Sequence, residues 1–210
     1  MVHSSQFTLD QFAPIAVYNK LKTHFKDEIS FLFESAGSSE GNYSFIIIGA
    51  QERLTFKDNI TTYTDKNSQK NIIEEDPFSF LKSYYNKLDM QAYRKKTQEL
   101  GIGYVDGFIG YIGYDMVKVF EPVLQSTMDA LEDELQTPDL DLIRPKLIVV
   151  YSHKTHKLTL VSSMQELADN FSTIEDKLKS SYDYVPLKPI ASDTQGSFAF
   201  SKEKFFDMVA

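Results

Sequence analysis

A carboxylate and a hydroxyl stand together at the end of a strongly apolar run in the first fifth of the chain. The run FLF leads directly into Glu34 and Ser35. Held at the end of a strand between aromatic neighbours, these two groups suit the ammonium and carboxylate of a bound amino acid, because charge-assisted hydrogen bonds orient such a ligand. The alternative is a half-buried strand in which Glu34 and Ser35 only mark the exit to solvent. The residues by themselves favour this second interpretation.

The four histidines are the next candidates for metal binding or catalysis. His153 and His156, in SHKTHK, have a spacing that can hold a metal ion on a helix. They fall, however, in the expected turn of a hairpin and beside lysines, whose positive charge disfavours a cation. We therefore interpret them as residues of a solvated turn. His3 and His24 have no recognisable partner, so no catalytic set of serine and histidine can be assembled.

A glycine run and a pair of acidic residues each resemble a known functional motif, but neither matches it. The glycine run GIGYVDG resembles a dinucleotide fingerprint, but Asp106 replaces the third glycine and no strand–helix–strand unit surrounds it. Asp115 and Glu121 are six residues apart and do not share a helix face, which argues against an acid–base pair. We expect Asp115 to cap a short helix or to pair with Lys118 or a distant cation.

Composition narrows the class of protein. The 210 residues, 42% hydrophobic and 25% charged, are sufficient for one sizeable domain or two small ones. The absence of cysteine excludes disulfides and thiolate chemistry, and the net charge of −8 argues against nucleic-acid binding. No apolar run approaches the roughly 18 residues of a membrane helix, and the first residues lack a secretion signal. We therefore expect a cytoplasmic protein with neither nucleic acid nor membrane among its partners.

Two-residue alternation predicts strands in the first third of the chain. In EISFLFESA the aromatic rings fall on one face and Glu34 on the other. NYSFIIIGA is apolar on both faces and is predicted to be a central strand. The segments ERLTFKDN and NITTYTD are predicted as two short antiparallel strands that turn at Asp58 and Asn59.

Helices and one hairpin are expected in the rest. Asp76 and Pro77 open a helical pattern as N-cap and first residue. GFIGYIGYDMVKVF indicates a strand and then a short helix before Pro122, and MDALEDELQTPDLD a solvated loop or frayed helix. RPKLIVVYSHKTHKLTLVSS is the clearest hairpin. An amphipathic helix follows, with apolar residues at helical spacing: Leu167, Phe171, Ile174 and Leu178.

The domain organisation follows from composition near the end of the chain. We expect a domain over residues 1–182, a linker rich in Pro, Ser, Asp and Gly over 183–200, and the truncated first helix of another domain over 201–210. This last segment begins with Ser201 as N-cap and carries aromatic residues that need a partner. We therefore expect an N-terminal fragment of a longer protein.

Four blocks of the sequence resemble one family. FLFESAGSSEGNYSFIIIGA resembles the segment of anthranilate synthase component I that runs from a Leu-Leu-Glu-Ser motif into an Arg-Tyr-Ser-Phe-Ile-Gly strand. GFIGYIGYDMVKVFEPV is similar to the family's Gly-Tyr-x-Gly-Tyr-Asp-x-Val-Arg-x-Phe-Glu block, and APIAVYNKL to its Thr-Pro-Val-x-Val-Tyr motif. SFAFSKEKFFDMVA is similar to the start of its chorismate-binding catalytic domain. The sequence departs from the pattern at Phe33, at Asn42 and in a shorter connecting loop.

The resemblance implies a fold and a site. It implies an α+β fold in which antiparallel sheets pack as a sandwich with flanking helices, and it makes residues 1–182 an N-terminal regulatory domain that carries much of a feedback site for L-tryptophan. Glu34 and Ser35 match the first motif, and Tyr43 and Ser44 match the strand that follows it. These four residues are therefore the candidate contacts of tryptophan.

The resemblance also implies the activity of the whole protein. The full-length form is expected to convert chorismate plus ammonia or glutamine to anthranilate and pyruvate in tryptophan biosynthesis, with a glutamine amidotransferase subunit as partner. Mg²⁺ is expected in the chorismate-binding domain, whose motifs lie beyond Ala210, so this fragment is expected to hold no cofactor and to be inactive. Two alternatives stay open: aminodeoxychorismate synthase component I of the folate pathway, and a non-catalytic module that docks the amidotransferase subunit.

Overall fold

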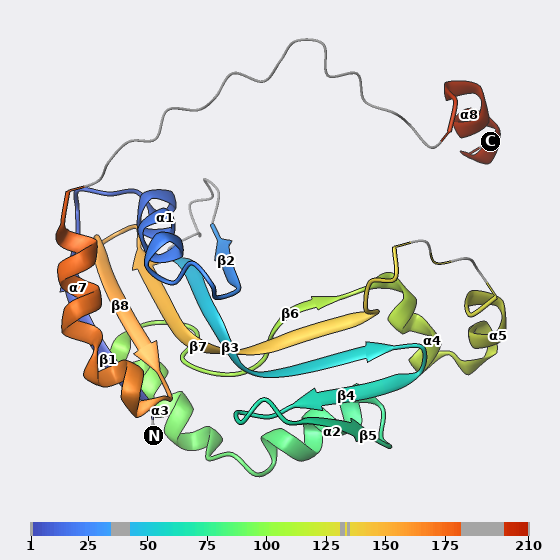
Figure 1. Ribbon diagram of the computed structural model, residues 1–210, viewed down its shortest axis with the longest axis horizontal. Helices are drawn as coiled ribbons and strands as arrows, with labels where there is room; N and C mark the ends of the chain where they lie inside the picture. Colours follow the sequence, from blue (N-terminus) through green and yellow to red (C-terminus); the bar gives the residue numbers. More distant parts are fainter. Residues whose placement is uncertain (1, 35–42, 131–132, 134, 182–199, 210) are drawn as a thin grey trace. The chain divides into compact units, whose positions relative to one another are not determined.

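The computed structural model describes residues 2–34, 43–130, 133, 135–181 and 200–209 (Figure 1). The chain separates into two compact units, Met1–Ser180 and Ser181–Ala210. Most of the expected linker lies outside the described residues. In the second unit, helix α8 spans Lys202–Val209, and the Ser201 hydroxyl accepts a hydrogen bond from the backbone N–H of Lys204 at 3.2 Å, as its predicted role of N-cap requires. The roles expected for the two units stay predictions.

The described part of the first unit contains eight strands in one antiparallel sheet. The strand order is β1-β8-β7-β3-β4-β5, with β2 added beside β3 and β6 beside β7. Together with the helices this confirms the α+β class. The strands are β1 His3–Thr8, β2 Ser30–Phe33, β3 Tyr43–Lys57, β4 Ile60–Thr64, β5 Lys70–Ile73, β6 Ile109–Ile112, β7 Leu140–Ser152 and β8 Lys157–Ser162.

The sheet curls because its two longest strands bend. β3 and β7 pair along their lengths, and their register shifts at a bulge between Ala50 and Glu52 (Figure 1). On one side of the bulge β2, β3, β7, β8 and β1 lie in order, and on the other side β5, β4, β3, β7 and β6 do. The expected antiparallel sheets are thus the two halves of one continuous sheet. The two strands predicted from NYSFIIIGA and ERLTFKDN are a single strand, because a bulge bends a strand without ending it.

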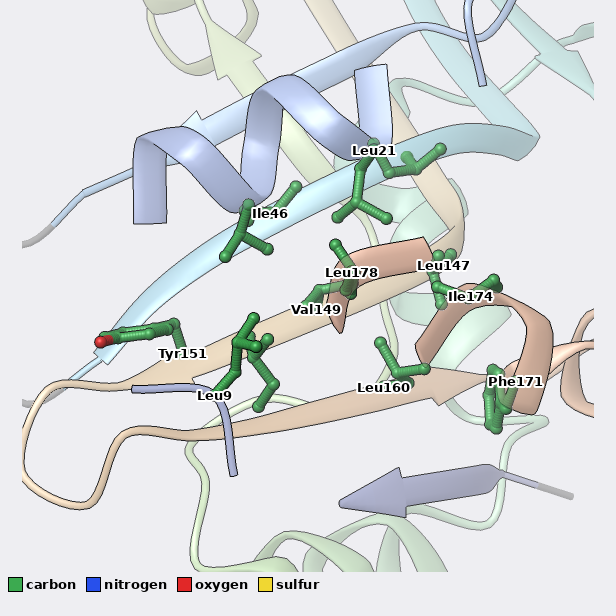
Figure 2. Close-up of a cluster of buried hydrophobic side chains, with 13 residues drawn as sticks. Leu9, Leu21, Ile46, Leu147, Val149, Tyr151, Leu160, Phe171, Ile174 and Leu178 are labelled. Carbon is green, nitrogen blue, oxygen red and sulfur yellow. The ribbon is translucent and has the colours of Figure 1, made fainter. Parts of the chain in front are cut away.

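One face of the first half is covered by helices α1 and α7. α1 spans Pro14–His24, and after β8 the short α6 spans Gln165–Asp169 and α7 spans Phe171–Lys179. Figure 2 shows side chains of both helices directed at β3 and β7, with Ile174 beside Leu147 and Leu178 beside Val149. The predicted amphipathic helix is confirmed as α7, with Phe171, Ile174 and Leu178 buried, but Leu167 belongs to the separate α6. Each fully buried Leu or Ile contributes on the order of 1.5–3 kcal/mol through burial.

The opposite face of this half is covered by helix α3, Met90–Leu100, and by the segment that follows it. Ile102 and Val105 of that segment pack on Ile47 and Val150. Periodicity did not predict α3, because the helix buries no residue completely. Its ends carry the missed signal: the Asp89 carboxylate accepts hydrogen bonds from two backbone N–H groups, and Gly101 ends the helix in the left-handed conformation.

The second half of the sheet packs on α2, Pro77–Tyr85, and on η1 and α4, which span Tyr114–Met116 and Val117–Phe120. The turns η2, Pro122–Leu124, and α5, Gln125–Met128, follow. The predicted cap is confirmed, since the Asp76 carboxylate accepts from the backbone N–H groups of Phe78 and Ser79. Two of the roles offered for Asp115 are wrong. The Lys118 ammonium lies 3.0 Å from both Asp129 and Asp139, and neither η1 nor α4 has a side-chain cap, their N-cap residues being Gly113 and Met116.

Candidate functional site

The predicted site lies where β2 ends beside β3. Phe33, the last residue of β2, pairs with Phe45 of β3. One step further in the same register are Glu34, which is exposed, and Ser44, which is fully buried. Ser35 lies outside the described residues. The structure thus brings the carboxylate of one predicted residue and the hydroxyl of another to the same end of the sheet.

Side-chain alternation puts these two groups on one face. Leu32 and Ile46 pack in the cluster under α1, whereas Phe31 packs in the cluster on the opposite face. Successive strand residues point to opposite faces, so Ser44 shares the face of Ile46, and Glu34, continuing the alternation of β2, shares the face of Leu32. The alternation predicted for this strand is confirmed.

A histidine that the sequence did not associate with this site contacts it. His153 lies in the turn between β7 and β8, half-buried, and its Nε2 forms a 2.8 Å hydrogen bond with the Ser44 hydroxyl. The Tyr151 ring packs edge-on against His153 at a centroid distance of 5.2 Å, and the Tyr151 hydroxyl is 2.9 Å from His156 Nδ1. The predicted hairpin is confirmed, but His153 is not a solvated turn residue. Its partner is 109 residues away, so no local pattern indicated the pairing.

Tyr43 faces the other way. It packs in the cluster of Ile47 and Ile102, and its hydroxyl donates a 2.6 Å hydrogen bond to the Gly101 carbonyl. Tyr43 therefore ties the first residue of β3 to the segment after α3. Among the described candidates, the structure brings Glu34 and Ser44 together on one face and directs the Tyr43 side chain to the other.

An apolar cavity of about 370 Å³ opens beside Phe33, between β2 and β6. Its volume falls in the range of small-molecule sites. Its polar groups already have partners: the Asp141 carboxylate accepts two hydrogen bonds from Arg53, and the Tyr111 hydroxyl donates to the Pro138 carbonyl. The cavity thus offers apolar surface and aromatic rings to a ligand. It is lined by Ile29, Phe31, Phe33, Ile109, Gly110, Tyr111, Asp141 and Ile143.

A buried ionic network occupies the bend of the sheet. The Arg144 guanidinium donates to both oxygens of Asp106, at 2.9 and 2.5 Å, and contacts Glu52 at 3.3 Å. The Tyr84 hydroxyl accepts from Arg144 and donates to Glu52. Burial by itself lowers the pKa of Arg144, but the hydrogen bond and charge of Asp106 outweigh it and raise that pKa. Every member has a partner, so this network holds the two halves of the sheet together and offers no open position to a ligand.

The network also explains the glycine run. GIGYVDG ends α3 at Gly101 and delivers Asp106 to Arg144, which is a structural use of the residues and not a phosphate loop. Within the described ranges, no group of three or more His, Asp or Glu side chains lies close enough to hold a metal ion. No helix in the same ranges is long and apolar enough to cross a membrane.

The chain matches one protein family and is similar in sequence to several of its members. Residues 28–210 match the model of a family described as chorismate binding enzyme. Anthranilate synthase component 1 of Aquifex aeolicus is 25% identical over 221 residues, covering 98% of this chain and 42% of the relative. The Acinetobacter calcoaceticus protein of that name is 28% identical over 155 residues, covering 72% and 30%. The Bacillus subtilis protein of that name is 31% identical over 159 residues, covering 74% and 28%.

A solved structure matches the fold. The crystal structure of anthranilate synthase component I from Streptococcus pneumoniae TIGR4 superposes with a TM-score of 0.59 at 20% sequence identity, covering 97% of this chain and 43% of that chain. The chain therefore spans less than half the length of the relatives named here.

Proposed function

Because this chain belongs to the family of chorismate binding enzymes, we propose that it is the N-terminal part of an anthranilate synthase component I and binds L-tryptophan as a feedback effector. The relatives named above support the first half of this proposal. The longer protein converts chorismate and ammonia to anthranilate and pyruvate, with ammonia supplied by a glutamine amidotransferase partner. Residues beyond this chain carry the catalysis and its Mg²⁺.

The observation that carries the effector proposal is the meeting of Glu34 and Ser44 at one end of the sheet, on one face. The Glu34 carboxylate accepts hydrogen bonds from the ammonium group of the effector. The Ser44 hydroxyl is fully buried and bonds His153, so in this proposal it acts on the effector's carboxylate through the half-buried His153 ring. Ser35, the neighbour of Glu34, adds a second hydroxyl, and Tyr43 holds the start of β3 through Gly101. The site thus recognises both charged groups of a free amino acid.

The apolar cavity beside Phe33 supports an aromatic side chain on that amino acid. Phe31, Phe33 and Tyr111 line it, and aromatic rings prefer offset or edge-on contacts with another ring. A volume of about 370 Å³ accommodates an indole. The cavity lies on the face of Phe31, opposite to that of Glu34 and Ser44. In this proposal tryptophan therefore passes round the end of β2, with its charged groups on one face and its indole on the other.

Regulation follows from differential affinity. Tryptophan inhibits because it binds more tightly to an inactive arrangement of the whole protein than to the active one, and it shifts the population by that difference. Glu34 follows directly on β2, so a ligand held there contacts the end of a strand that is half-buried and whose Leu32 packs against the core.

Calorimetric titration of tryptophan into the full-length protein tests the effector site. Glu34→Gln removes one charge-assisted contact and is expected to weaken binding about tenfold or more. Glu99→Gln, an exposed carboxylate on α3, is the matched control and is expected to bind like the parent. Unchanged tryptophan binding in Glu34→Gln would refute the assignment of this residue. This chain contains no tryptophan, so its own titration can also be followed by the fluorescence of the added ligand.

The product of the full-length protein tests the activity. Anthranilate formed from chorismate with ammonia or glutamine is the expected result. Aminodeoxychorismate as product would instead favour the folate-pathway relative. Absence of any reaction with chorismate, together with tight binding of an amidotransferase subunit, would favour the docking module.

A further inference from the structure

A second, smaller pocket lies near the start of β2, on the face that α1 and α7 cover. Its volume is about 200 Å³. It is distinct from the candidate effector site, since Ile48 in its wall pairs with Ser30 at the first position of β2, whereas Glu34 follows the last. It is lined by Phe25, Glu28, Ile48, Lys146, Leu147, Met164, Glu166, Leu167 and Asn170.

The pocket combines an apolar floor with an ion pair, and the exposed Glu166 adds a second carboxylate to its lining. Ile48 and Leu147 are buried beneath it, and Met164 is half-buried in its wall. Among the lining groups, the Glu28 carboxylate and the Lys146 ammonium are 2.5 Å apart, and about a third of each side chain, 31% and 33%, is exposed to solvent. The charged pair is thus accessible from outside while the floor is not.

Gly49 permits this arrangement. It has a φ of +69°, which glycine adopts without strain. A Cβ at this position would lie 2.7 Å from Lys146 Cδ and 2.9 Å from Glu28 Oε2, closer than atoms in contact approach. A glycine is therefore needed for both charged side chains to lie over β3 beside the pocket.

We propose that this pocket binds a small α-amino acid with an aliphatic side chain. A zwitterion presents an ammonium and a carboxylate next to each other, so it can exchange the single Glu28–Lys146 ion pair for two, one with each residue. A simple amine would leave Lys146 without its partner, and a simple carboxylic acid would leave Glu28 without its own. The ligand's side chain lies on Ile48 and Leu147. The volume, below that of sites for drug-sized molecules, limits this side chain to a few carbon atoms.

Titrations of the chain with a homologous series test both parts of the proposal. Glycine, alanine, 2-aminobutyrate and norvaline are added while the methionine methyl signals are followed by NMR, because Met164 lines the pocket and the chain has only six methionines. The Met164 signal is expected to shift, with affinity rising about fourfold for each added methylene that is buried. Butylamine and pentanoate each lack one charge of norvaline. Their affinities are expected to be lower than that of norvaline by about tenfold or more.

Charge variants locate the ligand. Glu28→Gln and Lys146→Met are each expected to weaken norvaline binding about tenfold or more, while Lys154→Met, an exposed lysine in the β7–β8 turn, leaves it unchanged. The double exchange of Glu28→Lys with Lys146→Glu keeps an ion pair and is expected to recover binding, which separates loss of the site from loss of the fold.

Three results would overturn the proposal. The first is a Met164 signal that does not move even near the solubility limit of norvaline. The second is affinity that does not depend on chain length or on both charges of the ligand. The third is binding that survives Lys146→Met and is lost in Glu34→Gln, since the ligand would then occupy the candidate effector site.

Discussion

The buried Arg144–Asp106 pair gives a quantitative test of what holds the bend of the sheet. The Asp106 side chain is 4% exposed and that of Arg144 12%, and two hydrogen bonds join them. Asp106→Asn keeps the shape but removes the charge. It also turns an N–H₂ group toward either the Arg144 donors or the backbone N–H of Gly107, which donates to Asp106 in the parent. The guanidinium is then left buried with Glu52, at 3.3 Å, as its one remaining carboxylate and with the hydroxyls of Tyr84 and Tyr93 as neutral acceptors.

The expected cost is that of breaking a buried pair from one side, about 3–5 kcal/mol of the free energy of unfolding. For a unit of this size each kcal/mol lowers the melting temperature by about 2–4 °C, so a decrease of about 6–20 °C is expected. Urea unfolding measures the free energy directly, with an unchanged m-value showing that the same surface is exposed on unfolding.

Asp141→Asn is the matched control. Asp141 also accepts two hydrogen bonds from one arginine, Arg53, but that arginine side chain is 47% exposed. The two pairs share their geometry and differ in burial, so the control is expected to cost about 1 kcal/mol or less. Equal losses in the two variants, or a loss below about 1 kcal/mol in Asp106→Asn, would refute the argument that burial makes the first pair indispensable.

Two further predictions concern the helices. Partial burial alone would raise the pKa of Asp76, but hydrogen bonds from the Ser79 hydroxyl and backbone and from Phe78 outweigh it and lower that pKa. Its cap is therefore fully formed above the ordinary carboxyl pKa and weakens as the pH falls through the lower, folded value. Asp76→Ala should cost about 1 kcal/mol at pH 7 in urea unfolding, and the difference from the parent should shrink in acid; a constant difference would contradict this. Leu178→Ala, at a fully buried position, should cost about 2–5 kcal/mol by the same assay, whereas the exposed Ile72→Ala should stay within about 0.5 kcal/mol.

Local chemistry accounts for the elements that the sequence predicted correctly. The hairpin of β7 and β8, the capped start of α2 and the apolar side of α7 each follow from residues within one or two turns of the chain. The turn at Asp58 and Asn59 belongs with them, since both residues have positive φ. Interactions of this kind do not depend on residues far away in the sequence.

The elements that were missed depend on distant partners. α3 is a charged segment with little apolar periodicity, and its packing comes from β3 and β7 on the far side of the sheet. β1 is a short strand near the start of the chain that exists through its pairing with β8. The unbroken length of β3 could not be predicted, because only β7, paired on both sides of the bulge, carries the strand past Gly49.

The residues of the candidate site were also determined partly by the sequence and partly by the tertiary structure. The sequence alone located Glu34 and Ser44, through an alternation of two residues and a family resemblance that both lie within one stretch of chain. The tertiary structure alone decided that Ser44 bonds His153, that Tyr43 turns to the opposite face, and that Glu28 meets Lys146 over Gly49. The physical reason is sheet register: a contact between strands depends on which residues of two distant segments are paired, and a shift of one residue would send each side chain to the other face.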